Sequence, residues 1–170
     1  MISDSSLNLN DSKKISKYIT YGKYERHNSY DFGSWKRAFF YAKDKGYLDN
    51  CEEILFCNDS VIGPIDSLDD FFISKEQENN PPFYGITINS FGYKDIYSTG
   101  NSVYSPHIQS YFFTISKEIF TKEFFLNFMK NIKKEDHKIK YIINYEMGLS
   151  KLIRDNGYGL KCMFHSRVDK

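Results

Sequence analysis

The alternation of strand-like and helix-like segments is the feature that most constrains the fold of this chain. Short segments typical of strands occur at residues 53–57, 83–88, 110–116 and 160–165, and weaker strand candidates at residues 1–5 and 23–26. Segments with helical periodicity or helix-start signals separate them, at residues 11–19, 33–46, 67–72, 117–132 and 138–158. Residues 89–106, rich in Asn, Ser, Gly and Tyr, are expected to form a long loop. Interleaved strands and helices predict a layered α/β fold, here in a single domain over residues 1–170.

The composition excludes several classes of protein. The chain has 170 residues, 41% of them hydrophobic, and a net charge of +1, which gives no long-range attraction for nucleic acid. Its 3 cysteines form no CxxC pair, so we expect neither a disulfide framework nor a zinc site. The start of the sequence does not resemble a signal peptide, and no stretch has the length of a transmembrane helix. We expect a cytoplasmic protein, either free or peripheral at the inner face of the membrane.

A carboxylate follows the most apolar of the expected strands. The run from Glu53 to Cys57 ends in Asn58, Asp59 and Ser60. Ligands of open α/β sheets bind beyond the carboxyl ends of the strands, which would make Asp59 a ligand-binding residue. The alternative is that this polar segment only forms an Asx turn.

A second carboxylate, Asp31, precedes an expected helix that begins at Gly33 and Ser34. It could cap that helix. A junction of this kind is also where backbone N–H groups receive phosphate. Arg26 lies close enough in sequence to pair with either the carboxylate or the phosphate.

Two polar side chains lead into the strand at residues 110–116. His107 and Gln109 alternate with Ile108, so both can project from one face of an extended chain. They are either structural or exposed, or they form an edge that binds a sugar or a phosphate.

Glu146 lies within the apolar stripe of the last expected helix. Ile142, Leu149 and Ile153 stand at offsets of −4, +3 and +7 from it. A buried carboxylate needs a partner or a wet cavity. The alternatives are a structural salt bridge, for example to Arg26 or Lys151, and a catalytic role.

Several of these stretches occur together in the order found in one family. The sequences YDFGSWKRAF, EILFCNDSVIGP, FYGITINS, HIQSYFFTIS and YEMGLSKLIRDNGY resemble the rhamnan synthesis protein F family of glycosyltransferases. The resemblance covers residues 3–158. It implies the nucleotide-binding α/β sandwich of A-type glycosyltransferases, here without the first strand. It also implies transfer of rhamnose from dTDP-L-rhamnose to a glycan or lipid-linked glycan acceptor, in the synthesis of a cell-surface polysaccharide.

The resemblance assigns roles to individual residues. Asp59 corresponds to the acidic motif that holds a divalent cation, Mg²⁺ or Mn²⁺, and the donor diphosphate, with Asn58 and Ser60 as neutral oxygen ligands. Asp31 corresponds to a segment near the donor nucleotide. Glu146 corresponds to the catalytic acidic residue, and as the base of an inverting transfer it should have a pKa raised by its apolar neighbours.

His107 and Gln109 are then expected to orient hydroxyl groups of the donor or the acceptor. The chain departs from the family pattern just before Asp31, where Ser29 replaces a glycine and His27 replaces an asparagine. Two other functions are compatible with the sequence. One is a non-catalytic module that binds a nucleotide sugar or a glycan. The other is a subunit that completes its sheet in a homo- or hetero-oligomer, because an incomplete sheet exposes a pairing edge.

Overall fold

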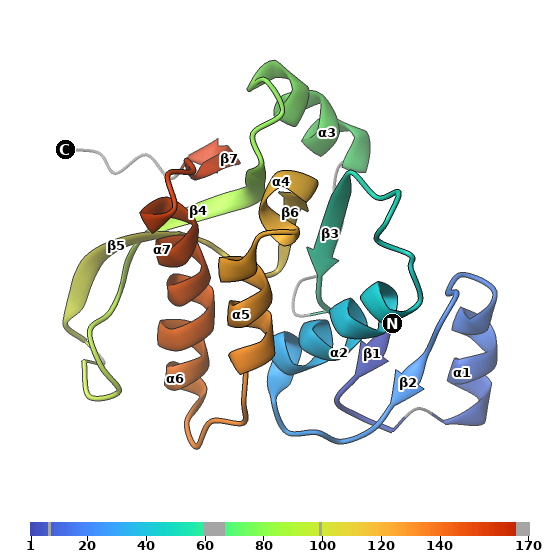
Figure 1. The fold of residues 1–170 in the computed structure, drawn as a ribbon. Coiled ribbons are helices and arrows are strands. Elements are labelled where there is room, and N and C mark those ends of the chain that lie inside the picture. Colours follow the sequence, from blue (N-terminus) through green and yellow to red (C-terminus); the bar gives the residue numbers. More distant parts are fainter. Residues whose placement is uncertain (7, 60–66, 99, 166–170) are drawn as a thin grey trace.

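A five-stranded sheet forms the centre of the computed structural model, which describes residues 1–6, 8–59, 67–98 and 100–165 (Figure 1). Its strands are β3 (Glu53–Cys57), β4 (Phe83–Tyr93), β5 (Ser102–Ile108), β6 (Phe112–Ser116) and β7 (Lys161–His165). All neighbouring pairs are antiparallel except β4 and β7, which are parallel. The sheet is therefore mixed, and β4 is its central strand.

Strands β5 and β6 follow one another along the same side of β4. The β6 ladder pairs Phe83 with Ile115, and the β5 ladder pairs Ile88 with Ile108. Residues 109–111 lie between the two ladders. Because β6 also pairs with β3, this interruption lies beside the end of β3, where Cys57 pairs with Phe112.

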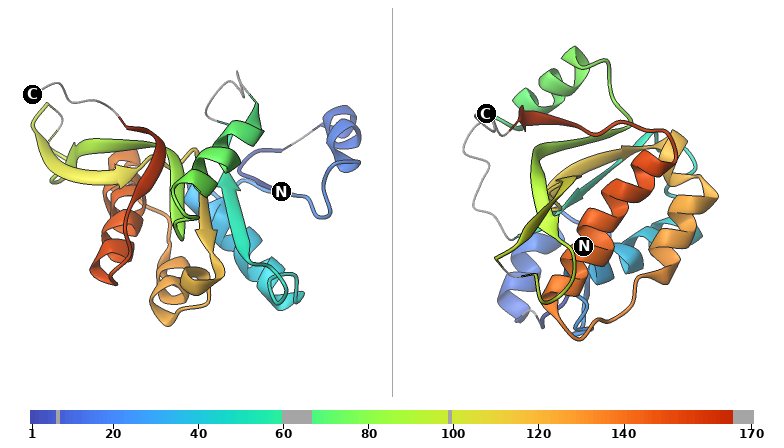
Figure 2. Two further views of the ribbon diagram at one scale, coloured as in Figure 1. Left: turned by 90° about the horizontal axis from the view of Figure 1, so that it is seen from above. Right: turned by 90° about the vertical axis from the view of Figure 1, so that its left-hand side faces the viewer.

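Helices cover both faces of the sheet (Figure 2). The face that carries the main core is covered by α2 (Tyr30–Asp44), α5 (Glu123–Asn131) and a continuous run of α6 (Lys138–Tyr141), η1 (Ile142–Met147) and α7 (Gly148–Asp155). Helix α3 (Leu68–Gln77) covers the other face, and the short α4 (Lys117–Phe120) follows β6. A separate two-stranded sheet joins β1 (Ile2–Ser3) to β2 (Lys23–Tyr24), with α1 (Leu9–Ser16) between them in sequence.

Consecutive residues of β4 explain why both faces are covered. Phe83 is 1% exposed and packs edge-to-face on Phe113 in the main core. Tyr84 is fully buried on the opposite face, where its ring packs against Phe71 of α3. Side chains alternate between the faces of a strand, so a run that is apolar at every position has to be covered on both sides.

The observed elements confirm the α/β class, with a strand or a helix at every expected position. The expected loop over residues 89–106 is wrong in large part. Its two ends form the outer half of β4 and most of β5, which pair as a hairpin extending from the sheet. The reason is that polar and aromatic residues alternate there, as on a solvated hairpin, and Phe91 packs edge-to-face on Tyr104 across the strands.

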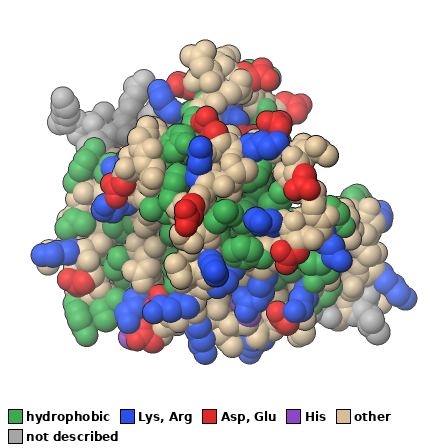
Figure 3. Space-filling model, in the orientation of Figure 1, with side chains coloured by type: hydrophobic (Ala, Val, Ile, Leu, Met, Phe, Trp, Pro, Cys, Tyr) green, Lys and Arg blue, Asp and Glu red, His purple; other side chains and the backbone are tan. Residues whose placement is uncertain are grey.

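The surface carries charges of both signs. Figure 3 shows acidic and basic side chains interspersed over the face that it presents. None of the helices in the described part of the chain is both long and apolar enough to cross a bilayer.

Candidate functional site

A cleft of about 940 Å³ opens where the carboxyl end of β3 meets the first turn of α2, the interruption at residues 109–111, the helical segment η1 and residues 1–5. Its polar lining residues come from all of these segments and from α6, and they include Asp4, Asp31, Asn58, Asp59, Gln109, Ser110, Lys138 and Glu146. Five residues singled out in the sequence thus meet in one cleft: Asp31, Asn58, Asp59, Gln109 and Glu146. Ser60 lies outside the described residues.

Asn58 joins three segments of the cleft. Its side-chain Nδ2 donates to Asp31 Oδ2 at 2.9 Å and to the carbonyl oxygen of Ser110 at 3.3 Å. Its backbone N–H donates to the carbonyl oxygen of Tyr111 at 3.1 Å. The next residue, Asp59, is exposed at the rim of the cleft. The strand β3 is therefore followed by Asn58, which holds three segments of the cleft together, and by Asp59, which is exposed in the cleft.

Asp31 lies in the first turn of α2 with its carboxylate in the cleft. Burial raises the pKa of Asp31, and the charges of Asp59 and Glu146 raise it further, although the hydrogen bond from Asn58 and the charge of Lys138 oppose the shift. The cleft thus concentrates negative charge. A cation bound there would relieve this repulsion.

Asp4, not Asp31, satisfies the amide groups at the start of α2 and just before it. Its carboxylate accepts hydrogen bonds from four consecutive backbone N–H groups, from His27 to Tyr30, at 2.6 to 3.2 Å. Burial raises the pKa of Asp4, but the hydrogen bonds from this loop outweigh burial and lower it. The loop needs positive φ angles of 54° at Asn28 and 48° at Tyr30 to aim its amides at one point. The sequence carries no local sign of this contact because Asp4 lies so far from the loop along the chain.

Gln109 is held at the edge of the sheet by Thr87 of β4. The Thr87 hydroxyl donates to the side-chain oxygen Oε1 of Gln109 at 2.7 Å. The backbone N–H of Gln109 donates to the backbone carbonyl oxygen of Thr87 at 3.1 Å. The hydroxyls of Thr87 and Tyr111 are 2.8 Å apart. Interruptions of a β ladder commonly redirect side chains beside an active site, and this one directs Gln109 and Ser110 into the cleft.

Glu146 is fixed at both carboxylate oxygens. Oε2 accepts hydrogen bonds from the Ser110 backbone amide, at 3.0 Å, and from the Ser110 hydroxyl. Oε1 lies 3.5 Å from Nε2 of His107. The proposed salt-bridge partner Lys151 instead pairs with Asp155, so the carboxylate is held by Ser110 and His107.

The expected rise in the pKa of Glu146 is wrong. Burial does raise it, but the hydrogen bonds from His107 and Ser110 outweigh burial and lower the pKa below its usual value. The side chain is 18% exposed, so it reaches the cleft while most of it is covered. Glu146 is therefore ionised and oriented at neutral pH.

His107 lies behind Glu146. It is 2% exposed and does not belong to the described residues that line the cleft. Among the described residues, its contact with a residue of the cleft is the one with the Glu146 carboxylate, so it lies behind the surface that a ligand would meet.

Residues 107–110, at the end of β5 and in the interruption that follows it, are docked on the helix that carries Glu146. Besides the two contacts of Glu146, the Ile108 amide donates to the hydroxyl of Ser150 at 3.0 Å, and Ser150 is 1% exposed. Sequence reasoning missed Ser110 and Ser150. Ser150 could have been found, because a residue four positions after Glu146 lies on the same helix face. Glu146 itself lies in the π-helical segment η1, a conformation that is frequent at functional sites.

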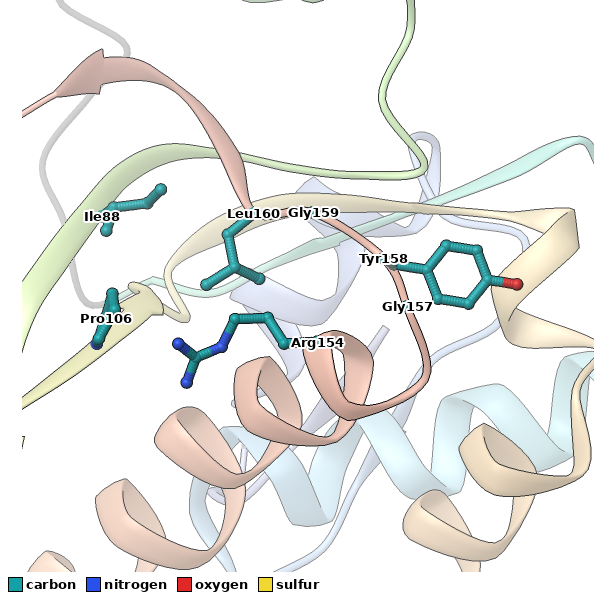
Figure 4. A pocket seen from close by; sticks show the side chains of 7 residues that line it. All are labelled: Ile88, Pro106, Arg154, Gly157, Tyr158, Gly159 and Leu160. Atoms are coloured by element: carbon teal, nitrogen blue, oxygen red, sulfur yellow. The ribbon is translucent and has the colours of Figure 1, made fainter.

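A second, more open hollow of about 560 Å³ lies between the sheet and the turn after α7 (Figure 4). Ile88, Pro106 and Leu160 supply apolar lining, and the Arg154 side chain extends along it. None of the expected site residues that the structure describes lines this hollow.

The residues of the large cleft suit a metal ion that is coordinated partly by the protein and partly by a bound ligand. No group of three or more His, Cys, Asp and Glu side chains among the described residues could hold a metal ion by itself. Asp31 and Asp59 nevertheless offer hard oxygen ligands in a cleft with excess negative charge. Mg²⁺ is commonly bound by one or two carboxylates together with substrate phosphates.

Comparisons with known proteins agree with the resemblance seen in the sequence. A family model described as rhamnan synthesis protein F matches residues 1–170, the whole chain. A search of curated proteins and a search of solved structures return no match. Because the family model spans the entire chain, this protein belongs to the rhamnan synthesis protein F family.

Proposed function

We propose that the protein is an inverting glycosyltransferase that moves rhamnose from dTDP-L-rhamnose to a polysaccharide acceptor. Family membership gives it a glycosyltransferase-related role in rhamnan synthesis. The observation that carries the proposal is the meeting of Asp31, Asp59 and Glu146 in one cleft at the carboxyl end of β3. Ligands of open α/β sheets bind at such ends, and an A-type glycosyltransferase fold is the architecture we assign to the domain.

The donor diphosphate binds at the end of β3 in this proposal. Asp59, exposed at the rim, and Asp31, held by Asn58, are the residues that would bind Mg²⁺ or Mn²⁺. Such a cation would supply positive charge to the leaving diphosphate. Asn58 keeps the two carboxylates on one side of the cleft through its contacts with α2 and with residues 110–111.

Glu146 takes the proton of the attacking acceptor hydroxyl. An inverting transfer needs a base on the face of the sugar opposite the leaving group. The two hydrogen bonds from Ser110 occupy Oε2, and the contact with His107 leaves Oε1 with a further lone pair, because a carboxylate accepts about four hydrogen bonds, two at each oxygen. Gln109, held by Thr87, is positioned to orient a sugar hydroxyl. Tyr30, half exposed in the cleft and in edge contact with Tyr141, offers a ring for a sugar or a base to pack against.

A non-catalytic module that binds a nucleotide sugar is the second candidate. It is favoured by the lowered pKa of Glu146, because a carboxylate with a lowered pKa is a weaker base. The same cleft would then bind the donor without transferring its sugar.

A screen of nucleotide sugars separates these functions. Calorimetric titration of the protein with dTDP-L-rhamnose, with UDP- and GDP-sugars, and with and without Mg²⁺ or Mn²⁺ tests binding. Transfer to a rhamnan acceptor, followed by mass spectrometry, tests catalysis. Metal-dependent binding with transfer supports the enzyme, and binding without transfer supports the module. Failure of every nucleotide sugar to bind contradicts both.

A further inference from the structure

The large cleft contains one basic side chain among several acidic ones. Lys138, the first residue of α6, is the single Lys, Arg or His among the described residues that line the cleft. The acidic side chains of the lining are those of Asp4, Asp31, Asp59 and Glu146. A lysine in this position either pairs with one of these carboxylates or remains available to an anionic ligand. Its contacts decide between the two.

The ammonium group of Lys138 is unpaired. It makes no hydrogen bond or ion pair with any residue of the described chain, and the side chain is exposed. Lys140, two residues later, instead pairs with Asp136 at 2.8 Å. The charge of Lys138 still reaches Asp31: burial raises the pKa of that carboxyl, and Lys138 opposes the rise. The two groups thus lie near each other without contact, and a ligand that binds the ammonium group breaks no existing contact.

Tyr141 fixes Lys138 beside the start of α2. The Tyr141 hydroxyl donates to the backbone carbonyl oxygen of Asn28 at 3.2 Å, and its ring packs edge-to-face on Tyr30 with 4.9 Å between the ring centroids. Tyr141 lies one helical turn after Lys138, and both residues line the cleft. The lysine is thereby held near the first turn of α2, which carries Asp31.

Glu146 lies further along the same helical run. It is about two turns from Lys138, roughly 10–12 Å along the helix axis. Both residues line the cleft, so this wall is positive at one end and negative at the other. A nucleoside diphosphate sugar carries its negative charge in the diphosphate and none in the sugar. Attraction at one end and repulsion at the other therefore favour one direction of binding, with the diphosphate toward Lys138 and the sugar toward Glu146.

We propose that Lys138 binds the diphosphate of the sugar donor and directs the sugar toward Glu146. The inference rests on the proposed transferase function and assigns a binding residue to it. An ammonium group donates up to three hydrogen bonds, and a diphosphate offers several acceptor oxygens. Hydrogen bonds between charged groups of this kind are among the stronger ones in proteins.

The contact strengthens as the transfer proceeds. The bond between the anomeric carbon and the diphosphate oxygen breaks, and its electron pair stays with the diphosphate. The acceptor oxygen forms the new bond to that carbon with a lone pair, and its proton passes to Glu146. The diphosphate thus gains a negative charge beside a fixed positive one. Lys138 therefore stabilises the transition state more than the bound donor.

Binding of diphosphates tests the contact. Calorimetric titrations of wild type and Lys138→Gln with thymidine, dTDP and inorganic pyrophosphate, each with Mg²⁺, compare ligands with and without the diphosphate. We expect Lys138→Gln to bind dTDP and pyrophosphate roughly tenfold to a hundredfold more weakly and thymidine equally well. Lys138→Arg keeps the charge and should retain most of the affinity. Lys134→Gln, at an exposed position outside the cleft lining, changes the net charge equally and should bind like wild type.

The direction of the donor is tested by comparing Lys138→Gln with Glu146→Gln. We expect Glu146→Gln to leave the dTDP affinity close to that of wild type. A donor bound in the reverse direction would give the opposite pattern: tighter dTDP binding by Glu146→Gln, because a repelling charge beside the diphosphate is gone, and unchanged binding by Lys138→Gln. That pattern overturns the inference. In transfer assays at saturating donor, kcat of Lys138→Gln should fall by roughly tenfold or more.

The outcomes distinguish the inference from the function on which it rests. A Lys138→Gln protein that binds dTDP as wild type does, whether or not it melts earlier by circular dichroism, overturns the inference and leaves the transferase function intact. Wild-type protein that binds dTDP through Lys138 but transfers no sugar overturns the transferase function, and the diphosphate contact stands. Wild-type protein that binds neither dTDP nor pyrophosphate overturns both.

Discussion

Nδ2 of Asn58 donates to Oδ2 of Asp31 at 2.9 Å and thereby joins the end of β3 to the first turn of α2. The two residues lie far apart in sequence, yet this contact sets where the Asp31 carboxylate lies relative to Asp59. The contact therefore places two carboxylates, those of Asp31 and Asp59, at the edge of the cleft. The effects of substituting either residue depend on this arrangement.

Removing the charge of Asp59 should abolish metal-dependent donor binding. Asp59→Asn keeps the shape of the side chain, and the residue is exposed, so the free energy of unfolding should change by less than about 0.5 kcal/mol. Calorimetric titration with the nucleotide sugar and Mg²⁺ measures the loss. The exposed Asp70 of α3, changed to Asn, is the control. Unchanged binding by Asp59→Asn would return Asp59 to the role of a turn residue.

Glu146→Gln should bind the donor normally and lose transfer. The amide oxygen can still accept from Ser110, but the amide cannot take up a proton. The loss of one positioned base lowers the rate by roughly a hundredfold to ten-thousandfold. Initial rates at saturating donor measure this effect, with calorimetry for affinity. A variant that mainly melts earlier while it retains its turnover would show that Glu146 is structural.

Asp31→Asn should stabilise the protein at neutral pH. The pKa of Asp31 is higher in the folded state than in the unfolded state, so ionising this carboxyl destabilises the fold. The destabilisation begins as the pH rises past the pKa of the unfolded state, and it is complete above the pKa of the folded state. The amide removes this cost and can still accept from Asn58. We expect a rise in Tm of at most about 4 °C at pH 7, equivalent to about 1 kcal/mol, that disappears below about pH 4. Thermal melts across this range check it, and a lower Tm at pH 7 would contradict it.

Asp4→Ala should destabilise the protein at neutral pH, in contrast to Asp31→Asn. The pKa of Asp4 is lowered, so its stabilisation is present above the unfolded pKa and is lost as the pH falls through the folded pKa. Loss of a side-chain cap costs about 0.5–2 kcal/mol, and several amides lose their acceptor here. Urea denaturation at pH 7 and at low pH measures the difference. Asp44→Ala at the other end of α2 is the control and should be neutral or slightly stabilising.

Local patterns were sufficient to predict the regular elements. The apolar run of β3 has the bounds that the sequence predicts, Glu53–Cys57. Ser67, the first residue of the helix expected at residues 67–72, caps α3 by accepting from the Asp69 backbone amide. The sequence predicts that the first helix begins at Asp11, but α1 begins at Leu9 with Asn8 as its cap, and Asp11 is the hydrogen-bond partner of Asn8 in the first turn. Such errors arise because several residues near a helix start can act as the cap, and only the backbone angles decide among them.

Contacts between distant segments could not be predicted in the same way. The sequence places Glu146 within an apolar stripe, but the hydrogen bonds from Ser110 depend on the interruption between β5 and β6. The direction of the pKa shift of Glu146 was missed for that reason. Asp4 was missed because its partners are brought to it only by the pairing of β1 with β2.

The central position of β4 has consequences for how fast the chain folds and how its amide protons exchange with solvent. Its backbone is paired with β5 and β6 on one side and with β7 on the other, and the β7 register joins Tyr84 to Lys161. Closing such distant pairs is slow, so we expect this chain to fold more slowly than a helical bundle of its length. The amide protons in the middle of β4 should exchange with deuterium only when the whole sheet separates, whereas those of the outer hairpin should exchange through local fraying.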